Sequence, residues 1–370
     1  MDFYITDYNV SEANAVALED CIMKKGSPAT AGSKMLENFV APFDATVVDR
    51  LRDAGIPISG KTQMPEFGID GFFADKPEEL SGSIRAVVEN AVHCCLCNDV
   101  FGLYRRQAAE NGLCYIHPTY GTVSRYGLVH LASSMDQIGV LCKNLADGFS
   151  LLATIAGHAP NDGAMFPEQS YHYQKAEKDM TVCVPSAIVN RTDERTQNAI
   201  RAFAEKFNTV DEPLDYFDVF SQVMYILSCA EISNNINRYD GIKFGYRSAN
   251  SPNLESLYTN TRTEAFGLET KLAAIMGAMV LSHEQYAPYY EKAMKIRRLV
   301  KQSLRFDKYD VIVLPTTLGG NPYEDLSLYA LATLAGLPTV SFSYQGCGIQ
   351  LVANVKNENA LLSAWEVSQS

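Results

Sequence analysis

The stretch TAGSKMLENFVAPFDATVVDRLRDAGIPISGKTQMPEF, residues 30–67, carries the clearest local signals of the fold. Within it, DATVVDRLRDAG (44–55) places an aspartate ahead of apolar residues at helical spacing and a glycine after them. This pattern predicts a short amphipathic helix over 44–55, capped by Asp44 and ended by Gly55. The apolar run that follows, Ile56–Ile58, predicts the start of a strand.

Helical and strand patterns alternate through the rest of the chain. Apolar residues at helical spacing predict helices over 144–158, with Gly157 at the end, over 286–304 and over 360–367. Continuous apolar runs predict strands over 310–314, 339–342 and 349–355, and the first reads as a strand buried on both faces. Such alternation predicts an α/β fold, a large sheet covered by helices on both faces, and favours one domain over 1–370.

The predicted helix over 286–304 combines an apolar stripe with a row of cations. The stripe is Tyr289, Ala293, Ile296, Leu299 and Val300; the cations are Lys292, Lys295, Arg298 and Lys301. A solvated helix face explains this pattern better than a nucleic-acid contact.

Composition excludes several functional classes. The chain has 370 residues, 47% of them hydrophobic, and a formal net charge of −12. The charge disfavours direct contact with DNA, tRNA or an acidic membrane surface, so tRNA is expected to bind only indirectly. The nine cysteines lie mostly in apolar runs, and no signal peptide or membrane span is evident. These features predict reduced thiols and a cytoplasmic protein.

The run HCCLC (93–97) is the one concentration of metal-binding residue types. Adjacent Cys94 and Cys95 on a strand would point to opposite faces, so buried structural cysteines are favoured over a zinc site or a cysteine nucleophile. The six histidines form no HExxH spacing, and no GxGxxG or Walker-type loop is present. We therefore expect no metal and no cofactor.

Several blocks resemble the amidase signature family, in particular its branch of glutamyl-tRNA(Gln)/aspartyl-tRNA(Asn) amidotransferase A subunits. Beside residues 30–67, the similar blocks are PTYGTVSRYGL (118–128), SSMDQIG (133–139), NRYDGIKFGYR (237–247), TRTEAFGLE (261–269), KYDVIVLPTT (308–317) and LAGLP (334–338). The resemblance implies an amidase signature fold, α/β with about ten or more strands in a mixed sheet, truncated at the N-terminus relative to the family.

The resemblance also implies that the catalytic residues are replaced. Family members use a lysine base, a bridging serine and a serine nucleophile beside an oxyanion-binding strip. In the matching register Glu19 stands at the lysine, Leu103 at the nucleophile and 100–102 (VFG) at the strip. The neighbouring Asp99, Arg105, Ala108, Ala109 and Gly112 match the family and support this register.

The bridging position falls near Glu79, within EELSGS (78–83), where Ser81 and Ser83 could substitute. A competing alignment treats SGSIR (81–85) as the nucleophile block, but it requires a long insertion before residue 118. An enzymatic alternative therefore stays open, in which Glu19 acts as general base for Ser81 or Ser83.

Substrate recognition departs from the family as well. The paired arginines expected after FGLE are Leu272 and Ala273 here, so the carboxylate clamp is expected to be absent. Tyr239, Asp240 and Arg262 match the family and are candidate binding residues, although structural roles explain them equally well.

Retained fold blocks beside a changed site predict a catalytically inactive paralogue of the amidotransferase A component. It would be a structural or regulatory member of a complex, with partners resembling the amidotransferase B and C subunits, in tRNA-dependent amidation. The alternatives are an amidase or acyl-transfer enzyme with a rewired site and a small-molecule-binding protein.

Overall fold

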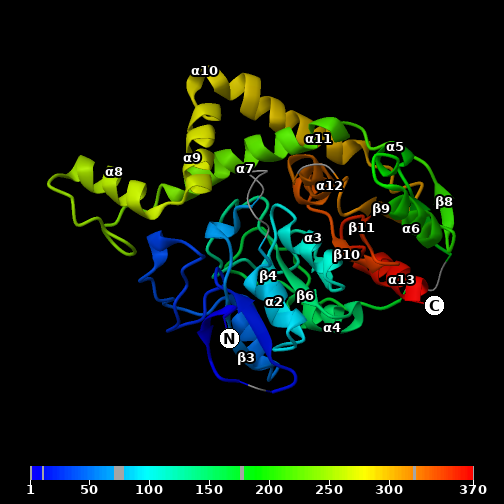
Figure 1. Ribbon diagram of the computed structural model, residues 1–370, viewed down its shortest axis with the longest axis horizontal. Coiled ribbons are helices and arrows are strands. Elements are labelled where there is room, and N and C mark those ends of the chain that lie inside the picture. The colour runs from blue at the N-terminus through cyan, green and yellow to red at the C-terminus, as the bar shows by residue number, and fades with distance from the viewer. Residues whose placement is uncertain (1, 11, 71–78, 176–178, 320–321, 370) are drawn as a thin grey trace.

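The computed structural model describes residues 2–10, 12–70, 79–175, 179–319 and 322–369. Over these residues eleven strands form one mixed sheet in the order β1-β3-β2-β4-β6-β5-β10-β11-β9-β7-β8 (Figure 1). The strands are β1 (Tyr4–Asp7), β2 (Val16–Glu19), β3 (Ile58–Thr62), β4 (Cys94–Asn98), β5 (Cys114–His117), β6 (Ile138–Cys142), β7 (Thr181–Cys183), β8 (Asn208–Val210), β9 (Val311–Pro315), β10 (Thr339–Tyr344) and β11 (Cys347–Ala353).

The helices connect these strands and cover the sheet. They are α1 (Thr46–Asp53), α2 (Gly82–Val88), α3 (Leu103–Glu110), α4 (Leu145–Ile155), α5 (Ser186–Val189), α6 (Glu194–Ala204), α7 (Phe220–Ile236), α8 (Leu254–Ala265), α9 (Leu268–Val280), α10 (His283–Gln285), α11 (Lys292–Ser303), α12 (Pro322–Ala335) and α13 (Glu358–Gln369). Short 3-10 turns form at η1 (Lys34–Leu36), η2 (Glu66–Gly68) and η3 (Phe217–Val219), and a π-helical turn at η4 (Tyr286–Glu291).

Alternation along the strands gives the sheet two apolar faces. Ala17 of β2 and Cys95 of β4 pack in a cluster with residues of α2 and α3, whereas Leu18 and Leu96 join the larger core. Helix α3 packs on β5, β10 and β11, and α4 and α13 pack on strands from the other side. The predicted α/β sheet covered on both faces is confirmed.

The helix predicted over 44–55 forms nearly as expected. Helix α1 ends where Gly55 adopts φ +68, and the N–H of Ile56 donates to the carbonyl of Leu51 at 2.9 Å. The predicted cap was wrong, because Ala45 is the N-cap residue and makes no side-chain cap. Asp44 lies one residue too early and accepts hydrogen bonds from the N–H of Lys25 (2.7 Å) and from Arg52 (2.9 Å) instead.

The predicted helix over 286–304 begins with the π-helical turn and continues as α11. Its predicted apolar stripe was only partly correct, since Tyr289 and Leu299 are each 42% exposed. Arg297 ties the helix to the body by donating to the carbonyl of Leu334 (Nε, 2.7 Å) and to the hydroxyl of Ser134 (2.9 Å). Because this cation anchors the helix, the apolar residues on its outer side stay in water.

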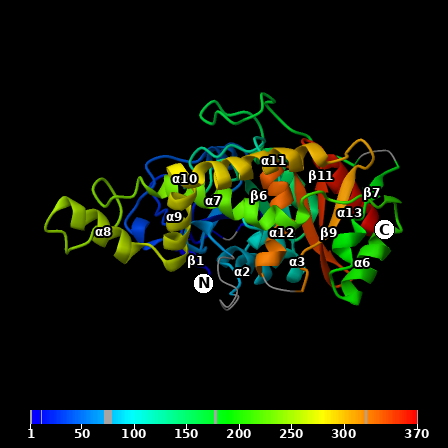
Figure 2. The same ribbon diagram turned by 90° about the horizontal axis from the view of Figure 1, so that it is seen from above.

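Helices α8, α9 and α10 extend beyond one end of the sheet (Figures 1 and 2). Helix α9 packs closely on α7 at Gly277. A Cβ atom added at this position would lie 2.0 Å from the carbonyl oxygen of Cys229. Only glycine permits this approach of two helix backbones. Among the described residues, no helix combines the length and apolarity needed to cross a bilayer.

Candidate functional site

Glu19 lies at the end of β2, and its side chain is fully buried. Its carboxylate accepts hydrogen bonds from the hydroxyl of Tyr104 (2.5 Å), the N–H of Asn98 (2.6 Å) and the thiol of Cys21 (3.3 Å). Burial raises the pKa of Glu19 to about 7, against the opposing effect of these hydrogen bonds. The structure thus holds a carboxyl group with a pKa near neutral that is hydrogen-bonded to Tyr104 of the first turn of α3.

The approach to α3 is organised around Asp99. Its carboxylate accepts from the N–H of Gly102 (2.6 Å), the N–H of Arg105 (3.0 Å) and the guanidinium of Arg105 (Nε, 3.1 Å). Gly102 has φ +93, and a Cβ there would lie 2.2 Å from the Tyr329 ring. The buried ion pair and the tight turn together set where α3 begins.

Leu103 is the first residue of α3 and is 8% exposed. It packs in the cluster that lies between the sheet and helices α2 and α3, together with Tyr104. Val100 and Phe101, which precede it, are buried in the larger core. Beside the ion pair, the side chains of Val100, Phe101 and Leu103 thus pack in the apolar cores at the start of the helix.

The two candidate serines lie at the start of α2. The hydroxyl of Ser81 accepts from the N–H of Ile84 (3.3 Å) and caps this helix, whereas the buried Ser83 hydroxyl lies 2.7 Å from that of Thr62. None of the hydrogen bonds described for these serines reaches Glu19. Glu79 is exposed, and the first residue of that segment, Glu78, lies outside the described residues.

Sequence reasoning missed a buried ion pair on the opposite face of the same strands. Lys61 of β3 is fully buried, with its Nζ 3.1 Å from the Asp20 carboxylate and donating to the carbonyls of Asp20 (2.9 Å) and Pro28 (2.6 Å). Removal from water lowers the pKa of Lys61, and Asp20 opposes that effect. A lysine within the otherwise uncharged strand Ile58–Thr62 was the available signal.

The candidate binding residues form a separate group near α8. Tyr239 stacks on Phe67 with ring centroids 5.4 Å apart, and the guanidinium of Arg262 donates to the carbonyls of Tyr239 (3.1 Å) and Asn237 (2.9 Å). Asp240 accepts from the N–H of Ile242 (2.8 Å) and so stabilises a turn. Each of the three therefore has an observed structural role.

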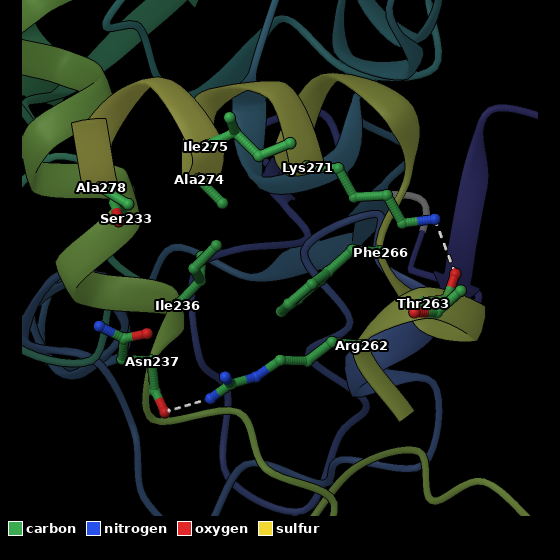
Figure 3. Close-up of a pocket in the computed structure, with 10 residues that line it drawn as sticks. All are labelled: Ser233, Ile236, Asn237, Arg262, Thr263, Phe266, Lys271, Ala274, Ile275 and Ala278. Carbon is green, nitrogen blue, oxygen red and sulfur yellow. Dashed lines mark hydrogen bonds between the residues drawn. The ribbon is translucent and has the colours of Figure 1, made fainter. Parts of the chain in front are cut away.

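Arg262 also lines a cavity of about 340 Å³ between the end of α7, α8 and α9 (Figure 3). Lys271 lies on its rim and donates to the carbonyl of Thr263 at 2.7 Å. Next to it along α9, Leu272 is half-buried and Ala273 is buried. The cavity thus has two cations near an otherwise largely apolar wall.

The HCCLC run forms β4 and the residue before it, and Cys94 and Cys95 pack in different cores, as predicted for adjacent strand residues. Within the part of the chain that the structure describes, no three His, Cys, Asp or Glu side chains are grouped so that they could hold a metal ion. Burial raises the pKa of Cys97, which stabilises the neutral thiol.

Comparison with known proteins places these features in a family. The family model described as Amidase matches residues 15–73 and 81–362. The chain belongs to the amidase family. The A subunit of the glutamyl-tRNA(Gln) amidotransferase of Lachnoclostridium phytofermentans is 35% identical over 373 residues, covering 90% of this amidase-family chain and 75% of that relative. Its counterpart in Neisseria gonorrhoeae is 34% identical and is covered over 85% of its length.

Solved structures agree with this assignment. The A subunit of the glutamyl-tRNA(Gln) amidotransferase of Thermotoga maritima has a TM-score of 0.75 and 27% identity, covering 98% of this chain and 86% of that one. The peptide amidase of Stenotrophomonas maltophilia, with a TM-score of 0.75 and 22% identity over 96% and 82% of the two chains, shares the fold.

Proposed function

We propose that this amidase-family chain is a catalytically inactive paralogue of the amidotransferase A component. In this proposal it is one domain over 1–370 and serves as a structural or regulatory member of a cytoplasmic complex in tRNA-dependent amidation, with partners resembling the B and C subunits. The observation that carries the proposal is the hydrogen bond of Glu19 to Tyr104, the residue that follows Leu103 in the first turn of α3.

The physical argument concerns proton transfer and nucleophilicity. Acyl transfer by this family requires a hydroxyl beside a neutral amine. At the corresponding positions this chain has the apolar side chain of Leu103 and the carboxyl group of Glu19, which already receives three hydrogen bonds. A leucine cannot attack a carbonyl carbon, so this arrangement supports an inactive site.

Covalent labelling separates the proposal from the rewired enzyme. A fluorophosphonate probe should give no labelling of the purified chain above that of a heat-denatured control, and ammonia release from glutamine should stay at background. Labelling that disappears in Ser81→Ala or Ser83→Ala, and also in Glu19→Ala, would support an amidase that uses these residues.

Affinity purification of the tagged chain from its native host tests the role in a complex. Mass spectrometry should identify stoichiometric proteins resembling amidotransferase B and C subunits. The net charge of −12 also predicts that the isolated chain leaves the mobility of tRNA unchanged at physiological salt. Recovery of the chain alone, as a monomer, would contradict the proposed role.

A further inference from the structure

Helix α9 is apolar on all sides over most of its length. The last nine residues of α9, LAAIMGAMV (272–280), contain no charged side chain. Ala273, Gly277 and Val280 on its inner side are buried against the body. An α-helix that is apolar all round is normally covered all round in the working state of the protein.

The outer side of α9 is in water. Leu268, Ile275, Met276 and Met279 are exposed by 65%, 67%, 36% and 46%. Their spacing of seven, one and three residues places them on one face of the helix. A continuous apolar face of this kind differs from isolated exposed hydrophobic residues and is typical of a protein interface.

The cavity beside α9 adds a charge preference to this face. Ile275 and Ala278 are among the residues that line the cavity, and so are Arg262 and Lys271 (Figure 3). None of the ten residues that line it is acidic. Backbone carbonyls hold both cations in place, because Arg262 donates to Asn237 and Lys271 to Thr263. The apolar face is thus flanked by two fixed positive charges in a protein whose net charge is −12.

We propose that the outer face of α9 is the docking surface for an amphipathic helix of another protein. The apolar side of that helix contacts Ile275 and Met279, and its acidic side chains lie toward Arg262 and Lys271. An amphipathic helix laid on a hydrophobic groove is an established mode of recognition. This inference rests on the proposed role in a complex, for which it specifies the binding surface and the kind of partner.

Charge disfavours a second copy of this chain as the occupant. A symmetric dimer would place the same patch on both sides of the interface, so Arg262 and Lys271 would approach their own counterparts. The net charge of −12 on each copy adds long-range repulsion. An acidic helix from a different protein avoids the repulsion between like cations in the interface, and it does not bring a second copy of this chain's net charge.

Photo-crosslinking in the native host tests the proposal directly. A photoreactive amino acid replaces Ile275, and a matched control carries it at Leu254, which is 59% exposed on α8. We expect crosslinks from position 275 to one segment of another protein that forms an amphipathic helix with net negative charge. Crosslinks to this same chain, to lipid or to a basic segment would overturn the proposal.

Substitutions on α9 measure how much its apolar and charged side chains contribute to binding of the partner. Ile275→Glu with Met279→Glu should reduce recovery of the crosslinked partner by about tenfold or more, because the new carboxylates would be buried unpaired in the interface. Lys271→Glu should also reduce recovery of the partner, and the reduction should be larger at low salt than at high salt. Leu254→Glu is the matched control, and unchanged thermal unfolding of each variant excludes a folding defect.

The outcomes separate the two proposals. If wild type brings down partners and the variant at 275 and 279 does so equally, the docking surface is wrong and the proposed role in a complex stands. If wild type brings down nothing, the role in a complex itself fails.

Discussion

Glu19 and Asp20 are neighbours in sequence and both are fully buried, yet the structure accommodates them in different ways. Glu19 receives hydrogen bonds from a phenol, a thiol and a backbone N–H, with no cation among the partners described for it. Asp20 lies 3.1 Å from the ammonium group of Lys61 and accepts from Thr30 as well.

The two carboxylates show two ways in which a protein stabilises a buried acidic side chain. Hydrogen bonds without a cation leave the pKa of Glu19 raised to about 7, so this group is protonated in the folded protein over a pH range where it is charged when unfolded. At the second carboxylate, the buried cation and anion depend on each other, and removal of one leaves the other uncompensated.

The largest effect is expected from removing the cation. Lys61→Met should lower the free energy of unfolding by about 3–5 kcal/mol, because Asp20 would remain buried without its counter-ion. Urea unfolding followed by circular dichroism measures this loss. The double variant Lys61→Met/Asp20→Asn should be more stable than Lys61→Met alone. Additive losses from the two substitutions would show that Asp20 and Lys61 do not depend on each other.

A pH-dependent effect is expected at Glu19. The folded pKa of about 7 lies above the usual 4.5, so the group's stabilising contribution is full below pH 4.5 and is lost as the pH rises through 7. At 1.36 kcal/mol per pKa unit this amounts to about 3 kcal/mol. Glu19→Gln removes this dependence, so it should gain stability relative to wild type between pH 5 and pH 8.

Urea titrations at pH 5 and pH 8 measure the free energy of unfolding of wild type and of Glu19→Gln. Glu37→Gln, at an exposed carboxyl, is the matched control and should parallel wild type. Equal pH profiles for Glu19→Gln and wild type would show that Glu19 has an ordinary pKa.

Removing the phenol should have a moderate effect. Tyr104→Phe deletes the hydroxyl that donates to Glu19 at 2.5 Å. Hydrogen bonds to charged groups contribute about 1.5–3 kcal/mol, so we expect a loss of about 2 kcal/mol at pH 8 and a smaller one at pH 5, where Glu19 is neutral. Chemical denaturation at the two pH values tests this, and an equal loss at both would contradict it.

The matched change at the second carboxylate should be the smallest. Thr30→Val removes the hydroxyl that donates to Asp20 at 2.5 Å but leaves the N–H of residue 30 and Lys61 in place. We expect a loss of only about 1 kcal/mol, because the N–H of residue 30 and the Lys61 ammonium group still contact the carboxylate. A loss exceeding that of Tyr104→Phe would reverse the ranking of the two sites.

Sequence patterns anticipated the sheet and its covering helices because apolar periodicity is a local signal. The run at 310–314 and the glycine at 55 fold as predicted, as β9 and as the end of α1. The cap at Asp44 failed because the helix begins one residue later than its pattern indicated. Tyr289 and Leu299 failed because Arg297, through distant contacts, decides which side of α11 faces the body.

The candidate site was less accessible to sequence reasoning. The register around Leu103 and Glu19 rested on family blocks, whereas the hydrogen bond from Tyr104 to Glu19 joins residues 85 positions apart. The pair of Lys61 with Asp20 likewise depends on β2 and β3 lying side by side. Contacts of this kind arise from strand order, which local patterns do not encode.

The glycine contact between α9 and α7 has a consequence for molecular recognition. Because Gly277 lets the two backbones approach to the limit of steric contact, α9 is held at a set distance and orientation before any ligand arrives. A receptor surface that is ordered in advance loses little conformational entropy on association. Whatever covers this helix would therefore carry most of the ordering cost itself.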